Sequence, residues 1–225
     1  MKDPEYVYAA LLDILGYRAF LRRDEEKGAV EFRHTMESAL SKLDDVGKDY
    51  SVQAISDTVI ITRAEHNTGH EFIELVRKTI VAFLKEGVLV RGGITYNNHY
   101  KNGNVTYSPA LTRAYEIENK EAIYPRVVVD ENVLRMLERD DGTIPELSGK
   151  ICRQNGVHWI NILHGEDAQE IWDAAKKVYL ESRDTLYRQE SAHMKHWWLQ
   201  EYLWSVANGE GEKLERYVSS PVVIE

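Results

Sequence analysis

An apolar segment that ends in a carboxylate constrains the fold of this chain more than any other feature. Residues 6–12 are nearly all apolar, as in a β-strand buried on both faces, and Asp13 follows them directly. A second aspartate, Asp57, sits in a short turn between two stretches, 50–55 and 58–62, that have strand character. These stretches predict two strands joined by a tight turn at Ser56-Asp57.

Asp13 and Asp57 are therefore both carboxylates at a point where a strand ends or turns. A carboxylate beside buried apolar residues is costly unless it is paired or bound to a cation. Two of them on neighbouring strands could hold a pair of divalent ions over a triphosphate. The plainer alternative is that both aspartates cap turns.

The rest of the chain alternates between helical and strand periodicity. Residues 17–46 carry apolar side chains at helical steps and are divided by Gly28. Further helices are expected at 70–86, 108–120 and 131–139, further strands at 88–96, 126–130 and 157–163, and a polar loop at 97–104. This order predicts an α+β fold, with a ferredoxin-like sheet and its helices on one face.

Residues 166–208 predict two more helices, and the second is rich in aromatic side chains: Trp197, Trp198, Tyr202 and Trp204. Aromatics on both sides of a helix indicate burial, either on the parent sheet or at a dimer contact. The chain is therefore expected to comprise a domain of residues 1–165 and a helical extension of residues 166–225. The two are expected to form a single structural unit.

The composition excludes several classes of protein. With 43% hydrophobic and 29% charged residues, the chain has the composition of a soluble globular protein. No apolar run approaches the ~18 residues of a membrane span, and the N-terminus lacks the pattern of a signal peptide. The single cysteine, Cys152, suits a reducing compartment, so a cytoplasmic location is expected. A net charge of -9 argues against sequence-independent binding of duplex nucleic acid, although not against a nucleotide substrate.

Four motifs together resemble a known family, the class III nucleotide cyclases. They are Leu12-Asp-Ile-Leu-Gly-Tyr17, Ile55-Ser-Asp57, Val90-Arg-Gly-Gly-Ile-Thr95 and Tyr107-Ser-Pro-Ala-Leu-Thr-Arg-Ala114. Their order and spacing match that family over about residues 6–130. Within it the chain is most similar to the pyrimidine cyclases of bacterial Pycsar antiphage systems, which share the Arg91-Gly-Gly-Ile strand and the stretch from Tyr124 to Asp130.

The resemblance implies a homodimer with its active sites at the subunit interface. It implies two divalent ions, Mn²⁺ or Mg²⁺, held by Asp13, Asp57 and the backbone carbonyl of Ile14. The turn Leu15-Gly16-Tyr17, at a helix N-terminus, would offer amide N–H groups to the substrate phosphates. The implied reaction is attack of the ribose 3′-oxygen of a nucleoside triphosphate on its α-phosphorus, with release of pyrophosphate. The effector that reads the product would be a separate protein.

The chain departs from the purine-specific relatives at the base. Relatives that use ATP carry a lysine six residues before the second metal aspartate, whereas this chain has Ser51 there, preceded by Tyr50. The other base-reading position falls at Val105. Tyr50 is bulky enough to narrow the pocket toward a single-ring base. The alternative is that Tyr50 is merely a strand residue.

A second departure concerns the transition state. Where many relatives have an asparagine and, four residues on, an arginine, this chain has Thr112 and Glu116. Thr112 could still bond the ribose, and Arg113 is the nearest substitute for the arginine. Lys101 is a candidate for the β- and γ-phosphates, or an exposed loop lysine without a role. Arg91 could be a structural ion-pair partner on its strand.

These observations predict a uridylate cyclase that converts UTP to cyclic UMP as an antiphage signal. Cytidylate cyclase activity on CTP is the alternative within the same family. The sequence also leaves open a purine cyclase with unusual base contacts, and a catalytically inactive module that binds a nucleotide and dimerises.

Overall fold

The computed structural model describes residues 5–42, 50–102, 105–209 and 214–219. Among them, the strands are β1 (Glu5–Ile14), β2 (Tyr50–Ile55), β3 (Thr58–Arg63), β4 (Val90–Asn102), β5 (Val105–Tyr107), β6 (Val127–Val129), β7 (Ile151–Gln154) and β8 (Val157–Ile160). The α-helices are α1 (Tyr17–Lys27), α2 (Glu31–Ser41), α3 (Gly69–Lys85), α4 (Pro109–Lys120), α5 (Glu131–Leu137), α6 (Ala168–Ser182) and α7 (Glu190–Gly209). Short 3₁₀ turns occur at η1 (His66–Thr68), η2 (Pro145–Leu147) and η3 (Arg183–Leu186).

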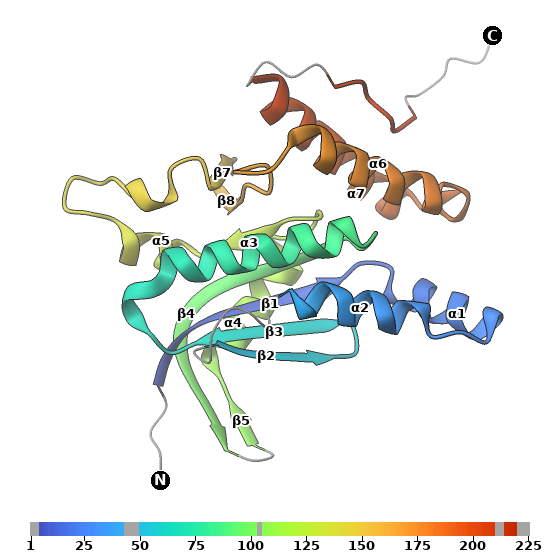
Figure 1. Cartoon of the computed structure of the whole chain (residues 1–225). Coiled ribbons are helices and arrows are strands. Elements are labelled where there is room, and N and C mark those ends of the chain that lie inside the picture. The colour runs from blue at the N-terminus through green and yellow to red at the C-terminus, as the bar shows by residue number, and fades with distance from the viewer. Residues whose placement is uncertain (1–4, 43–49, 103–104, 210–213, 220–225) are drawn as a thin grey trace.

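The strands form one sheet in the order β2-β3-β1-β4-β6-β8-β7, with β5 paired to β4 (Figure 1). The apolar β1 lies in the middle and pairs antiparallel with both β3 and β4. This pairing places Asp13 opposite Thr58 on one side and Arg91 on the other. The strand β6 runs parallel to β4.

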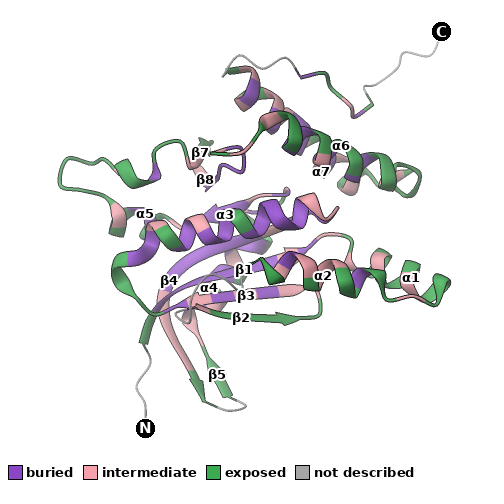
Figure 2. Cartoon of the chain, in the orientation of Figure 1, coloured by how far each residue is buried: buried purple, intermediate pink, exposed green. Residues whose placement is uncertain are grey.

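Helices cover both faces of the sheet, and not one face as the element order predicts. Tyr8 on β1 packs against α3. Its hydroxyl lies so close to Gly69, at the start of α3, that a Cβ atom on Gly69 would be only 2.8 Å away. Successive residues of a strand point to opposite faces, and the next residue along, Ala9, packs against Ala110 of α4. Figure 2 shows α3 and the middle of the central strands as buried.

The helix α4 lies unusually close to the sheet. A Cβ on Gly93 of β4 would be 2.7 Å from the Ile117 side chain and 2.8 Å from the Ala114 carbonyl, so only glycine allows this approach. The predicted start of α4 is confirmed, because the Ser108 side chain caps it by accepting a hydrogen bond from the Leu111 N–H at 3.0 Å. The close packing fixes the inner face of α4 against β4 and β1.

The hairpin of β4 and β5 replaces the polar loop predicted at 97–104. The strand β4 continues to Asn102 because it pairs first with β1, as far as Glu5 opposite His99, and then with β5. This part of β4 belongs to an arm that projects from the sheet, on which residues 97–100 are half-buried and Lys101 and Asn102 are exposed (Figure 1). Residues 103 and 104 of the predicted loop lie outside the described residues.

The C-terminal helices pack on the chain itself. Trp198 of α7 stacks on Tyr124 with ring centroids 5.2 Å apart, and the buried Tyr202 donates a hydrogen bond to Asn161 at 2.8 Å. Tyr202 is buried and Trp198 half-buried within the chain, and a dimer contact of this helix stays a prediction. Trp197 remains 43% exposed. No helix in the described part of the chain is long and apolar enough to cross a membrane.

Candidate active site

The fold brings Asp13 and Asp57 to the same end of the sheet. Asp13 is the penultimate residue of β1, and Asp57 lies in the two-residue turn between β2 and β3. The Ile14 N–H donates a hydrogen bond to the Asp57 carbonyl at 2.8 Å, which ties the turn to the end of β1. Ser56 adopts a left-handed conformation, with φ 57°, to close this turn. The juxtaposition predicted from the sequence is therefore present.

Arg91 and Glu118 complete a charge cluster around Asp13. Arg91 lies directly opposite Asp13, and its Nε donates to the Asp13 carboxylate at 3.0 Å. The same guanidinium contacts the carboxylate of Glu118, which reaches in from α4 and is only 5% exposed. The structure therefore supports the interpretation of Arg91 as an ion-pair partner.

Glu118 was not predicted from the sequence. Burial raises the pKa of its carboxyl group, and the charges of Asp13 and Asp57 raise it further, while Arg91 lowers it. The signal for Glu118 lies in α4 itself, where it follows Ala110, Ala114 and Ile117 on the buried face of the helix. A buried carboxylate is costly without a cationic partner, so an acidic residue on a buried helix face indicates a charge cluster.

The phosphate-binding turn predicted at Leu15-Gly16-Tyr17 precedes and opens α1. Gly16 has φ 80°, and its carbonyl accepts a hydrogen bond from the Ala19 N–H at 2.8 Å. The Leu15 N–H already donates to the Leu89 carbonyl at 2.9 Å. The Tyr17 ring packs edge-on against Phe32 of α2. Of the three predicted amides, that of Leu15 is therefore engaged within the fold.

The structure brings Arg113 together with Asp130 rather than with the aspartate pair. Its guanidinium makes two hydrogen bonds to the Asp130 carboxylate, at 2.9 and 3.0 Å, and a longer one to Glu121 at 3.4 Å. The hydrogen bond to Asp130 is the main reason why the pKa of Arg113 is raised. Thr112 donates its hydroxyl to the Ser108 carbonyl one turn back, at 3.2 Å. In the described residues neither side chain bonds to Asp13, and their catalytic roles stay predictions.

Ser51 and Lys101 lie on the face of the sheet that carries Asp13. Ser51, Gln53 and Ile55 alternate along β2 and therefore point to the same side. Ile55 pairs with Thr58 of β3, and Thr58 pairs with Asp13 of β1, so this side is the face that carries Asp13. Lys101 of β4 donates a hydrogen bond from Nζ to the Gln53 side-chain oxygen at 3.1 Å. Gln53 is a residue of this face that sequence reasoning missed. Gln53 could have been found from the sequence, because it lies two residues after Ser51 in a predicted strand and therefore points to the same face.

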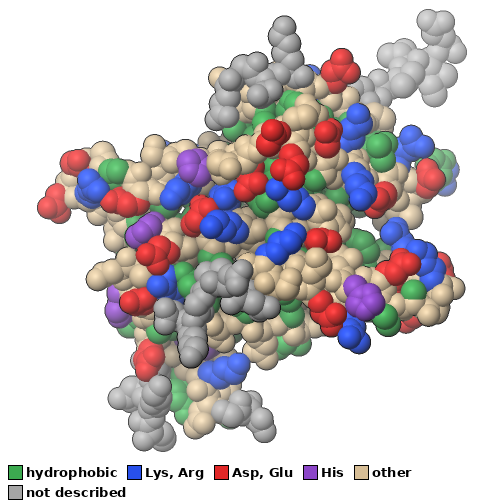
Figure 3. All heavy atoms as spheres, in the orientation of Figure 1, with side chains coloured by type: hydrophobic (Ala, Val, Ile, Leu, Met, Phe, Trp, Pro, Cys, Tyr) green, Lys and Arg blue, Asp and Glu red, His purple; other side chains and the backbone are tan. Residues whose placement is uncertain are grey.

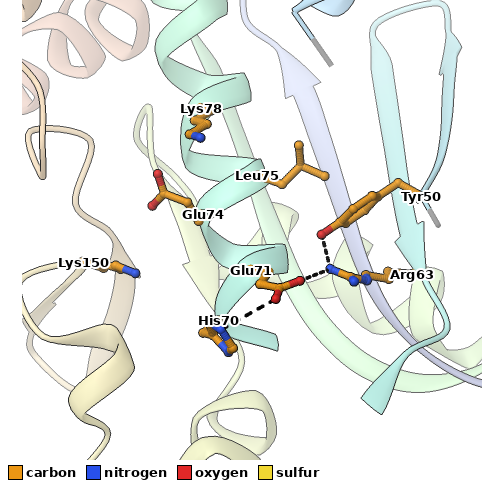
Figure 4. A pocket seen from close by; sticks show the side chains of 8 residues that line it. All are labelled: Tyr50, Arg63, His70, Glu71, Glu74, Leu75, Lys78 and Lys150. Atoms are coloured by element: carbon orange, nitrogen blue, oxygen red, sulfur yellow. Dashed lines mark hydrogen bonds and ion pairs between the residues drawn. The ribbon is translucent and has the colours of Figure 1, made fainter. Parts of the chain in front are cut away.

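Tyr50 lies on the opposite face, and the structure does not bring it together with the other candidates. Its hydroxyl contacts Arg63, and its ring stacks over Phe72 of α3 with centroids 6.3 Å apart. It lines a cavity of about 420 Å³ between α3, β3 and Lys150 (Figure 4). The interpretation of Tyr50 as the residue that narrows a base pocket beside Asp13 therefore lacks support, because adjacent strand residues point in opposite directions.

The 420 Å³ cavity is separate from the carboxylate cluster. Its acidic residues are engaged internally, since Glu71 pairs with Arg63 at 2.7 Å and Glu74 with Arg77 at 2.8 Å. On the molecular face drawn in Figure 3, basic and acidic side chains are interspersed and form no patch of one sign. The lining also includes Lys78 and Lys150, so the cavity carries a small excess of positive charge.

The chemistry of Asp13 and Asp57 suits divalent cations. Carboxylate oxygens are the ligands that Mg²⁺ and Mn²⁺ prefer. In the described residues no group of three or more His, Cys, Asp and Glu side chains is arranged to hold a metal. A metal site here would thus use two carboxylates, with the remaining ligands from the backbone, the substrate or water. Asp13 and Asp57 therefore fit a site for divalent ions. In this structure the Arg91 guanidinium balances the charge of Asp13.

Comparisons with known proteins identify the fold. No protein-family model matches the sequence, and no curated protein matches it. Among solved structures, the chain is similar to the catalytic core of a rhodopsin-guanylyl cyclase with converted specificity in complex with ATPαS, at a TM-score of 0.50 and 12% identity over 71% of this chain and 97% of that chain. It is also similar to a bacterial light-regulated adenylyl cyclase, at a TM-score of 0.50 and 10% identity over 79% of this chain and 100% of that chain. The chain has the α+β fold of class III cyclase catalytic domains, with the helix α7 near its C-terminus.

Proposed function

We propose that this chain is a nucleotide cyclase that converts a pyrimidine nucleoside triphosphate, UTP in preference to CTP, to the 3′,5′-cyclic monophosphate and pyrophosphate. The observation that carries the proposal is the position of Asp13 and Asp57 at the same end of the sheet, on a cyclase fold. The sequence motifs that surround both aspartates support it. They also suggest a homodimer and a role in antiphage signalling through a separate effector.

Asp13 and Asp57 would hold two divalent ions, Mn²⁺ or Mg²⁺, together with the backbone carbonyl of Ile14. Bound there, such ions supply a lower pKa for the ribose 3′-hydroxyl and neutralise charge on the triphosphate. The hydrogen bond from Ile14 to the Asp57 carbonyl keeps the two carboxylates in register. In the reaction the 3′-oxygen bonds to the α-phosphorus, its proton passes to solvent, and the bond to the pyrophosphate oxygen breaks.

Gln53 supports the preference for uracil. Lysine is only a donor, so Lys101 takes the Gln53 side-chain oxygen and leaves the NH₂ group of Gln53 to donate to another acceptor. An NH₂ group donates to the 4-oxygen of uracil and meets an unfavourable second donor at the 4-amino group of cytosine. Gln53 lies two residues from Ser51, on the same face, where the resemblance places base recognition.

The first experiment incubates the purified chain with ATP, GTP, CTP and UTP in the presence of Mn²⁺ and identifies the products by mass spectrometry. We expect cyclic UMP from wild type and none from Asp57→Asn. The matched control is Asp184→Asn, whose side chain is 97% exposed and should leave turnover unchanged. A cyclic purine as the main product would contradict the pyrimidine assignment.

The base assignment has its own test in Gln53→Glu. The carboxylate accepts a hydrogen bond from the cytosine 4-amino group, so the ratio of kcat/KM for UTP to that for CTP should fall by at least about tenfold. Gln154→Glu, at the exposed end of β7, adds the same charge away from the site and should leave the ratio unchanged. An unchanged ratio in both variants would remove Gln53 from base recognition.

A nucleotide-binding module without turnover is the second candidate function. The ion pair between Arg91 and Asp13 favours it, because that guanidinium competes with a metal for the carboxylate. The engagement of Arg113 by Asp130 favours it as well. Binding of a nucleoside triphosphate with Mn²⁺, seen as a rise in Tm but without product from any of the four substrates, would select this candidate.

A further inference from the structure

The helix α7 docks beside the strand that carries Arg91. Trp198 stacks on Tyr124, and the Arg126 guanidinium lies 5.3 Å from the Trp198 ring centroid. The backbone carbonyl of Arg126 accepts a hydrogen bond from the Gly92 N–H at 3.0 Å. Because Gly92 directly follows Arg91, these contacts hold this part of α7 close to the start of β4.

One turn earlier, the same face of α7 carries Lys195. The buried Leu199 lines a small cavity together with Val90 and Pro125, which shows which side of α7 faces β4. Residues four apart lie one above the other on a helix, so Lys195 projects from that same side. Val90 pairs with Ile14, the residue after Asp13. Lys195 therefore lies near the start of β4, where Arg91 follows Val90.

The electrostatic environment of Lys195 agrees with this placement. Its side chain is half-buried, and burial lowers the pKa of its amino group. Arg91 lowers that pKa further, while Asp13 and Glu118 raise it, so the ammonium group lies within the field of the cluster. Within the residues that the structure describes, its ammonium group has no ion pair at 4 Å or less. The cation therefore lies near the cluster without an ion pair that would fix its position.

We propose that Lys195 is a substrate-binding residue, which places its ammonium group on the terminal phosphates of the bound nucleoside triphosphate. The proposal rests on the proposed function, because it requires a triphosphate at Asp13 and Asp57. A triphosphate brings about four negative charges to a cluster that already holds three carboxylates and one guanidinium. A flexible, partly desolvated ammonium group suits phosphate binding as a point charge. The helix α7 thereby becomes part of the active site.

The test measures binding of inorganic tripolyphosphate in the presence of Mn²⁺ by isothermal titration calorimetry. This probe has neither base nor ribose, so its binding is independent of base preference and of turnover. We expect Lys195→Met to weaken binding about tenfold, as for loss of one charge-assisted hydrogen bond, and Lys195→Arg to retain most of it. The matched control, Lys176→Met, removes an exposed lysine of α6 and should bind like wild type. Lys195→Gln replaces the methionine variant if that variant does not fold.

Two results would overturn the proposal. One is equal affinity of wild type and the folded Lys195 variants for tripolyphosphate. The other is tighter binding of Mn²⁺ alone with unchanged affinity for tripolyphosphate, which would mean that Lys195 only balances the carboxylates. The product assay reports separately on cyclase activity. A chain that makes no cyclic nucleotide but loses tripolyphosphate affinity in Lys195→Met would refute the proposed function and retain Lys195 as a phosphate ligand.

Discussion

The ion pair between Arg91 and Glu118 predicts a pH-dependent loss of stability in Arg91→Met. Glu118 is buried, and Arg91 is the group that lowers its pKa against the effects of burial and of the two aspartates. Removal of one partner from a buried ion pair costs about 3–5 kcal/mol, because the remaining charge is buried and unpaired. For a chain of this size that corresponds to a fall in Tm of about 6–20 °C.

The pH dependence follows from the direction of the pKa shift. The native pKa of Glu118 lies above its value in the unfolded chain, so its contribution to stability is full below the unfolded pKa and declines as the pH rises through the native pKa. Without Arg91 the native pKa moves higher still, and the decline extends to higher pH. Arg91→Met should therefore lose more stability at pH 8 than at pH 5.5.

Differential scanning calorimetry of four proteins checks this reasoning: wild type, Arg91→Met, Glu118→Gln and the double variant. Glu118→Gln keeps the shape of the side chain without its charge, so the double variant should recover most of the stability that Arg91→Met loses at pH 8. An equal loss at both pH values, or no recovery in the double variant, would refute the argument from a buried, unpaired carboxylate.

Three further predictions test the packing and the buried groups. Gly93→Ala places a methyl group against Ile117 and should lower the unfolding free energy by about 1–3 kcal/mol, whereas Gly209→Ala, with open space around it, should have little effect on Tm. Burial raises the pKa of Cys152 to about 11, so native alkylation by iodoacetamide at pH 8 should be at least about 100-fold slower than in urea; comparable rates would contradict this. Burial lowers the pKa of His196 to about 4, so its contribution to stability is full above pH 6.5 and lost as the pH falls toward 4, by roughly 3 kcal/mol. Thermal melts of His196→Gln should show a shallower acid dependence by that amount.

Local rules account for the parts of the fold that the sequence predicts well. The strands 50–55 and 58–62, the turn at Ser56-Asp57 and the helix predicted at 70–86 agree with β2, β3 and α3 to within one residue. Each depends on neighbours in the sequence, through alternation, a cap or a glycine stop. The strand β7, which was not predicted, carries such a signal as well, because Asn155-Gly156, with φ 50° and 75°, forms a two-residue hairpin turn to β8.

Long-range pairing accounts for the parts that the sequence does not predict. The position of α4 on the second face of the sheet depends on Gly93 and Ala9 meeting helix residues far along the chain. Glu118 meets Arg91, the ion-pair partner of Asp13, only through that packing, and Lys195 comes near this cluster only through the docking of α7. Tyr50 and Ser51 are adjacent in the sequence, yet their side chains point to opposite faces of the sheet because they alternate along a strand. Only the register of β2 against β3 and β1 decides which of the two faces Asp13.

The strand β2 lies at an edge of the sheet, and this position bears on how the chain behaves in concentrated solution. Within the part of the chain that the structure describes, β2 pairs with β3 alone, and its sequence from Tyr50 to Ile55 contains neither a charged residue nor a proline. An edge strand without charge or proline can pair with the same strand of another molecule. Self-association should therefore begin at β2. A lysine in place of Val52, which is 40% exposed, is a minimal change expected to protect the edge.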